Sequence, residues 1–89
     1  MNPLPGEDLV RKGLRDLAED RFTVEACLVS IGAPRLGTVG FDPGPRTIPM
    51  AEHRLYQLLA REDSDSAHSR YNALIRKLVS FERAAARVK

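Results

Sequence analysis

The sequence predicts an all-α fold, a small irregular bundle of four helices that ends in a long C-terminal helix. Apolar residues between 67 and 88 recur alternately four and three positions apart, which is the spacing of an a/d seam on one helix. Segments 7–20 and 49–61 also carry apolar residues at helical spacing, with polar residues between them. Thr23 stands as a helix N-cap before a short apolar run.

Length and composition predict one soluble globular domain over residues 1–89. An apolar fraction of 43% and a charged fraction of 29% are typical of a folded chain rather than a disordered one. Residues 1–6, with two prolines and a glycine, are expected to form an extended arm. Residues 40–48, rich in proline and glycine, are expected to be an internal connection.

The first helix is predicted from Glu7 to about Asp20. Its two leading carboxylates, Glu7 and Asp8, lie at the positive end of the helix dipole. Gly13 costs this helix about 1 kcal/mol relative to alanine. Such a glycine often marks a close helix crossing, and we expect Gly13 to face a neighbouring helix.

The apolar run 24–31 fits either a short buried helix or a buried strand. The preceding cap and the following Gly32, in the position of a C′ residue, favour the helix. Cys27 within this run is the only cysteine and is expected to be a small buried hydrophobe. The next stretch, 33–40, is compatible with one further short helix with Pro34 at its first position.

The third main helix is predicted to begin with Pro49 in its first turn and to end near Arg61. The polar residues 62–66 separate it from the last helix, for which Ser64 or Asp65 would be the N-cap. A connection this short predicts an antiparallel hairpin of the third and fourth helices.

The long seam has two interpretations, the core of a monomer or the interface of a homodimer. Three shorter helices do not reach far enough to cover it, so the stretch 81–88 would be exposed unless a second chain packs on it. Self-association is therefore the preferred prediction, with another protein as a further potential partner. The residues assigned to it are Tyr71, Leu74, Leu78, Phe81, Ala85 and Val88.

Two substitutions test what the seam does in the protein. Leu74 and Leu78 are expected to be fully buried, and Leu78→Ala should cost about 2–5 kcal/mol of stability. Phe81→Glu is expected to separate a dimer while leaving the helices intact, because two charges would meet in an apolar contact.

Nucleic-acid binding is the alternative and less favoured function. The net charge of +2 gives little steering toward nucleic acid, so only a local cluster of cations would bind phosphates. Such a cluster is predicted on the outer side of the last helix, although a solvated outer face is the favoured interpretation of these cations. Its members are Arg70, Arg76, Lys77, Arg83 and Arg87.

The sequence offers no pattern typical of an enzyme, a cofactor site or a metal site. His53 and His68 lack the spacing of a metal-ligating pair, and the carboxylates near them cluster at a helix–helix turn. No signal peptide or membrane-spanning run is present, so no membrane partner is predicted and the expected location is cytoplasmic. The predicted function is therefore a small cytoplasmic interaction protein.

Overall fold

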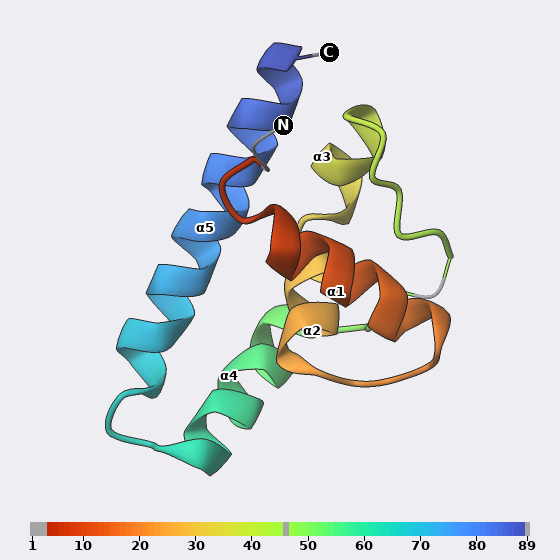
Figure 1. Cartoon of the computed structure of the whole chain (residues 1–89). Helices are drawn as coiled ribbons and strands as arrows, with labels where there is room; N and C mark the ends of the chain where they lie inside the picture. Colours follow the sequence, from red (N-terminus) through yellow and green to blue (C-terminus); the bar gives the residue numbers. More distant parts are fainter. Residues whose placement is uncertain (1–3, 46, 89) are drawn as a thin grey trace.

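The structure is a computed structural model that describes residues 4–45 and 47–88, and these residues form helices without a strand. Figure 1 shows a long C-terminal helix that runs along one side of the molecule, with the shorter helices gathered beside it. The all-α prediction is confirmed, including the further short helix. The elements are α1 (Glu7–Ala18), α2 (Val24–Ile31), α3 (Ala33–Thr38), α4 (Ala51–Glu62) and α5 (Ala67–Val88).

Segment 24–31 is a helix, which resolves the choice between helix and strand. The Thr23 hydroxyl accepts a hydrogen bond from the Ala26 amide at 3.1 Å, as an N-cap should. Gly32 ends α2 with φ −87°, so it is not the left-handed C′ residue that the sequence suggested. A Cβ on Gly32 would lie 2.8 Å from Glu82 Oε2 and 3.0 Å from Leu78 Cδ1, so a larger residue there would require these side-chain ends to shift.

Three predicted helix boundaries differ from the structure. α1 ends at Ala18, because Asp20 takes a left-handed conformation with φ 59° that stops the helix. Pro49 lies before α4 rather than in its first turn, and Met50, with φ 54°, directs the chain into the helix. α5 begins at Ala67, so the turn before it is longer than a cap at 64 or 65 would make it.

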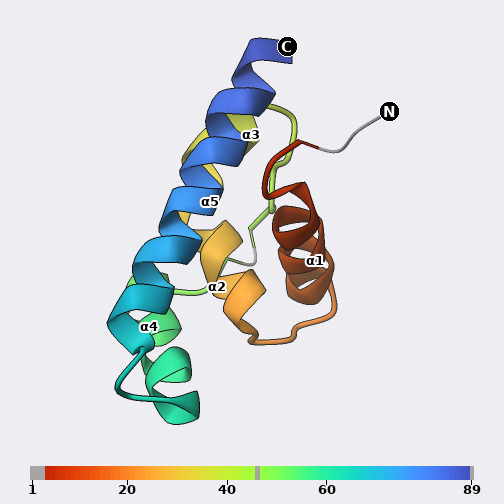
Figure 2. The same ribbon diagram turned by 60° about the vertical axis from the view of Figure 1, so that its left-hand side comes forward.

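The predicted N-terminal arm folds back on the protein over its described part. Residues 1–3 lie outside the described residues, but Leu4 to Gly6 form a turn closed by a hydrogen bond of 3.0 Å from the Glu7 amide to the Leu4 carbonyl. This turn packs beside the middle of α5, where a Cβ on Gly6 would lie 2.8 Å from the Lys77 carbonyl oxygen. Figure 2 shows the N-terminal turn next to α5 from a second direction.

Phe81, in the far half of the α5 seam, is contacted by segments that are not helices. Phe81 is 0% exposed, and the Phe41 ring from the 40–48 connection meets it edge-on with ring centroids 4.9 Å apart. Arg11 of α1 lies over the Phe41 ring, with its guanidinium carbon 5.3 Å from the ring centroid. The prediction that 81–88 would be exposed in one chain is therefore wrong for Phe81 and Ala85, which are buried. It holds for Val88, which is 73% exposed.

The prediction that Leu74 and Leu78 are both fully buried is half correct. Leu78 is 3% exposed and packs against the α2–α3 junction at Gly32. Leu74 is only partly buried, because α4 and the start of α2 leave a groove in front of it.

Leu78→Ala is expected to lower the free energy of unfolding by about 2–5 kcal/mol, since it leaves a cavity inside a close-packed region. Leu74→Ala is the matched substitution on the same helix and should cost clearly less, because Leu74 already contacts solvent. Urea denaturation of both variants measures the difference. Equal losses would contradict this assignment of core and groove.

Candidate functional site

A groove with a volume of about 640 Å³ lies between α2, α4 and α5. Its walls come from the turn before α2 and the first residues of that helix, the end of α4, and the first half of α5. We call it the α2–α4–α5 groove. Its lining residues are Phe22, Thr23, Val24, Glu25, Leu58, Arg61, Glu62, Arg70, Ala73, Leu74 and Lys77.

The apolar part of the groove borders the core without being sealed by it. Leu58 of α4 and Leu74 of α5 are partly buried and pack against buried core residues from the groove side. Phe22 stands at the rim with 70% of its surface exposed. Phe22 thus adds an exposed aromatic side chain to the apolar part of the groove.

Basic side chains dominate the rim of the groove. Glu62 and Arg70 pair across the α4–α5 turn at 2.8 Å, and Glu25 pairs with Lys12 of α1 at 3.4 Å. Arg61 and Lys77 are exposed and form no ion pair with the described residues. The carboxylates of the groove are thus already partnered, while two of its cations are available to a ligand.

A second hollow of about 260 Å³ continues the groove along α4. The two share Phe22, Leu58 and Arg61, so they are adjacent parts of one surface. The second hollow adds Ile48, Cys27, Gln57 and Arg54 to the lining. Cys27 is buried at its base, and burial raises the pKa of its thiol, which is the opposite of what a reactive thiolate requires.

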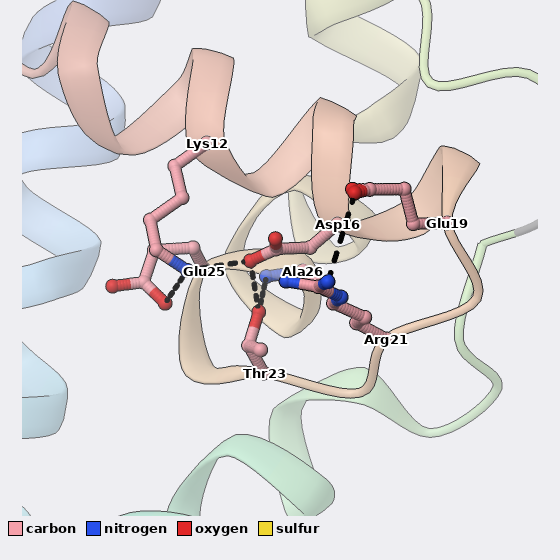
Figure 3. A network of polar contacts seen from close by, with 7 residues as sticks. All are labelled: Lys12, Asp16, Glu19, Arg21, Thr23, Glu25 and Ala26. Atoms are coloured by element: carbon pink, nitrogen blue, oxygen red, sulfur yellow. Dashed lines mark hydrogen bonds and ion pairs between the residues drawn. The ribbon is translucent and has the colours of Figure 1, made fainter.

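A network of polar contacts holds the turn that carries the α2 wall of the groove. Figure 3 shows Asp16 of α1 receiving hydrogen bonds from Lys12 Nζ at 2.7 Å and from the Thr23 hydroxyl at 2.6 Å. The same Lys12 ammonium contacts Glu25, and the Thr23 oxygen also caps α2. Asp16 is 3% exposed, so this buried carboxylate ties the N-terminal end of α2 to α1.

The Asp16 network predicts a pH-dependent stability. The hydrogen bond from Lys12, followed by that from Thr23, lowers the pKa of the Asp16 carboxyl below its ordinary value of 3.8. A carboxyl with a lowered folded-state pKa stabilises the fold above its unfolded pKa, and this contribution is lost as the pH falls through the folded value. Asp16→Asn should therefore be less stable than the wild type at pH 7, and this difference in stability should narrow as the pH falls below about 4.

Urea denaturation of the wild type and Asp16→Asn between pH 7 and pH 3 measures this gap. The effects of other carboxyls on stability cancel in this comparison, because both proteins contain them. Glu82 is one of these carboxyls: burial raises its pKa, so its effect on stability has the opposite pH dependence. A gap that stays constant across this range would contradict the role given to the Asp16 charge.

The residues predicted for self-association do not form one surface. Leu78, Phe81 and Ala85 are buried within the single chain, because the N-terminal turn, the 40–48 connection and the α2–α3 junction pack around this part of α5. Leu74 lines the groove, and Tyr71 lies near Tyr56 of α4 with ring centroids 6.0 Å apart. Val88 alone of the six is largely exposed.

The residues predicted for phosphate binding divide into two sets. Arg70 and Lys77 line the groove, and Arg70 is engaged with Glu62. Arg76, Arg83 and Arg87 are exposed, form no ion pair with the described residues and follow one line along α5. Of the five cations predicted to bind phosphate, three therefore form a line along α5, and the other two line the neighbouring groove.

Several groove residues had no assigned role in the sequence. Phe22 lies between the predicted helices, Leu58 lies within the predicted helix 49–61, and Arg61 marks only the end of that helix. The one available signal was Phe22, a large aromatic between polar neighbours in a turn. Their grouping depends on how α2 packs against the α4–α5 hairpin, which no local spacing encodes.

Within the described residues, no group of three or more His, Cys, Asp or Glu side chains could hold a metal ion. His68 instead contacts Asn72 one turn away, with 3.3 Å between ring nitrogen and amide nitrogen. None of the described helices is both long enough and apolar enough to cross a bilayer. No family model matches the chain, and no curated protein or solved structure shows significant similarity to it.

Proposed function

We propose that this protein is a cytoplasmic interaction module that acts by binding another polypeptide rather than by catalysis. The observation that carries the proposal is the α2–α4–α5 groove, in which partly buried Leu58 and Leu74 lie beside an exposed Phe22. Its volume falls within the range of ligand sites, roughly 300–1,000 Å³. The groove is open and continues into a second hollow, a shape that suits an extended surface of a macromolecule better than an enclosed small molecule.

The end of α5, which the sequence assigned to self-association, is better suited to a partner other than a second copy of this chain. Phe81, the largest member of the predicted dimer interface, is fully buried in the chain itself. The exposed end of α5 carries Arg83 and Arg87, so two copies placed end to end would bring like charges together. A second protein is therefore the preferred partner, and a second copy is an outcome that the test below distinguishes.

Site-specific photo-crosslinking in the native cell tests this function. A photoreactive amino acid in place of Ala73 would lie in the groove, and the same group in place of the neighbouring Asn72 would lie on an exposed face outside the groove lining. We expect a discrete crosslinked polypeptide from position 73 and none from position 72. No crosslink at 73, equal products at both positions, or a product containing only this chain would overturn the proposal.

Nucleic-acid binding is a second candidate, favoured by the exposed line of Arg76, Arg83 and Arg87, which form no ion pair with any residue that the structure describes. Titration with labelled duplex DNA and RNA at low and moderate salt tests it, since phosphate contacts are strongest at low ionic strength. Binding that falls with salt, and that is weakened by Arg76→Ala but not by Lys77→Ala, would support this candidate. Absence of binding at low salt would eliminate it.

A further inference from the structure

We infer that the α2–α4–α5 groove binds an amphipathic helix of a partner protein, with the apolar side of that helix on the groove floor and acidic residues on its flanks. The inference rests on the proposed function, because it names the kind of polypeptide that the groove would hold. Three features of the groove carry it: its charge, its lack of backbone partners and its length.

The charge of the groove selects an acidic partner. The groove and the adjoining hollow contain more cations than carboxylates, namely Arg54, Arg61, Arg70 and Lys77 against Glu25 and Glu62. Both carboxylates are already engaged, Glu25 by Lys12 and Glu62 by Arg70. A ligand therefore meets an uncompensated positive rim around an apolar floor, and carboxylates beside apolar side chains are its complement.

The secondary structure of the walls selects a helix. Ala73 and Lys77 lie inside α5, where the backbone groups bond within the same helix, and the amide of Ala26 in the first turn of α2 is taken by Thr23. The described residues contain no strand, so these walls offer no sheet edge on which an extended peptide could pair. A partner segment that enters the groove must satisfy its own backbone hydrogen bonds, which a helix does.

The length of the groove matches a short helix. On α4, the lining of the groove and of the adjoining hollow together extends from Arg54 to Glu62, which is about 12 Å along the helix axis; on α5, the lining of the groove extends from Arg70 to Lys77, about 10 Å. Anchors at positions i, i+3 or i+4, and i+7 of a partner helix span a similar distance, about 10 Å. Two turns of an amphipathic helix therefore cover the apolar floor and place their flanking carboxylates near the basic rim.

The absence of tryptophan in the chain makes a direct binding experiment available. A synthetic peptide of about fifteen residues, with Leu anchors, Glu on the flanks and one Trp among the anchors, would report its own burial by its fluorescence. Three control peptides carry Lys for Glu, a scrambled sequence of the same composition, or a central proline. We expect the acidic amphipathic peptide to bind the full chain at least about tenfold more tightly than each control.

Charge-reversed variants of the protein locate the binding site. Arg61→Glu and Lys77→Glu should each weaken binding of the acidic peptide by about tenfold, because each replaces an attraction by a repulsion at the rim. Arg76→Glu is the matched control, since Arg76 neighbours Lys77 but lies outside the groove lining, and it should change the affinity less than twofold. All three positions are exposed, and thermal unfolding confirms that the variants are folded.

Several results would overturn the inference. Tighter binding of the Lys peptide than of the Glu peptide would contradict the preference for an acidic partner. Equal binding of the scrambled or the proline peptide would contradict an amphipathic helix as the ligand. An equal loss of affinity in Arg76→Glu would show that the binding site lies outside the groove. If no peptide binds while Ala73 still yields a crosslinked protein, the helix assignment fails and the proposed function survives. If position 73 yields no crosslink, the proposed function itself fails.

Discussion

Phe81→Ala is expected to lower the free energy of unfolding by about 3–5 kcal/mol, which is a large fraction of the stability of a chain of this size. The side chain is fully buried, and the substitution removes the ring together with its edge-on contact with Phe41. Phe81→Glu should unfold the protein outright, because a carboxylate would be buried there without a partner. Circular dichroism during urea denaturation measures both effects.

Val88→Ala is the control for Phe81. It lies on the same seam two turns further along α5, is 73% exposed, and should change the stability by less than about 0.5 kcal/mol. A Phe81→Glu protein that keeps its full helical signal would contradict the packing described above. It would restore the prediction that Phe81 faces a second chain.

The helices could be predicted because each is encoded by residues close together in the sequence. The apolar spacing of α5, the Thr23 cap of α2 and the acidic first turn of α1 are local features, and each corresponds to an observed helix. The errors lie at helix ends. There the left-handed Asp20 and Met50 decide where the helix stops or starts, and neither residue type requires that conformation.

The cover of Phe81 could not be predicted, because it comes from segments without periodicity. Phe41 and Leu4 lie in proline- and glycine-rich stretches, where spacing says nothing about which way a side chain points. Counting only helices as cover made α5 look half exposed and led to the dimer prediction. The groove was hidden for the related reason that Phe22, Leu58 and Leu74 meet only when three helices are packed.

Gly13 was predicted to face a neighbouring helix, and the structure confirms this. A Cβ at this position would collide with the Glu25 carbonyl oxygen of α2 and would lie 2.7 Å from Val29 Cγ1. α1 and α2 therefore cross at a point where only glycine fits. Because the obstacle includes backbone, no side-chain rotation can relieve the collision.

Gly13→Ala sets two effects of opposite sign against each other. Alanine stabilises a helix interior by about 1 kcal/mol relative to glycine, whereas forcing atoms into a close-packed contact costs about 1–3 kcal/mol and occasionally more. With a backbone oxygen as the obstacle, we expect the upper part of that range, because α1 must move away from α2. The net result should be a loss of about 2 kcal/mol in the free energy of unfolding, measured by urea denaturation.

Gly37→Ala isolates the helix-propensity effect. Gly37 lies in α3, and the nearest atom to a Cβ there would be Asp42 Cγ at 3.9 Å, an ordinary contact. The same chemical change should therefore leave stability unchanged or raise it by up to about 1 kcal/mol. If Gly13→Ala also stabilised the protein, α1 and α2 could not cross as closely as the structure shows. Because Lys12 and Asp16 of α1 hold Thr23 and Glu25, a shift of α1 would also move the α2 wall of the groove.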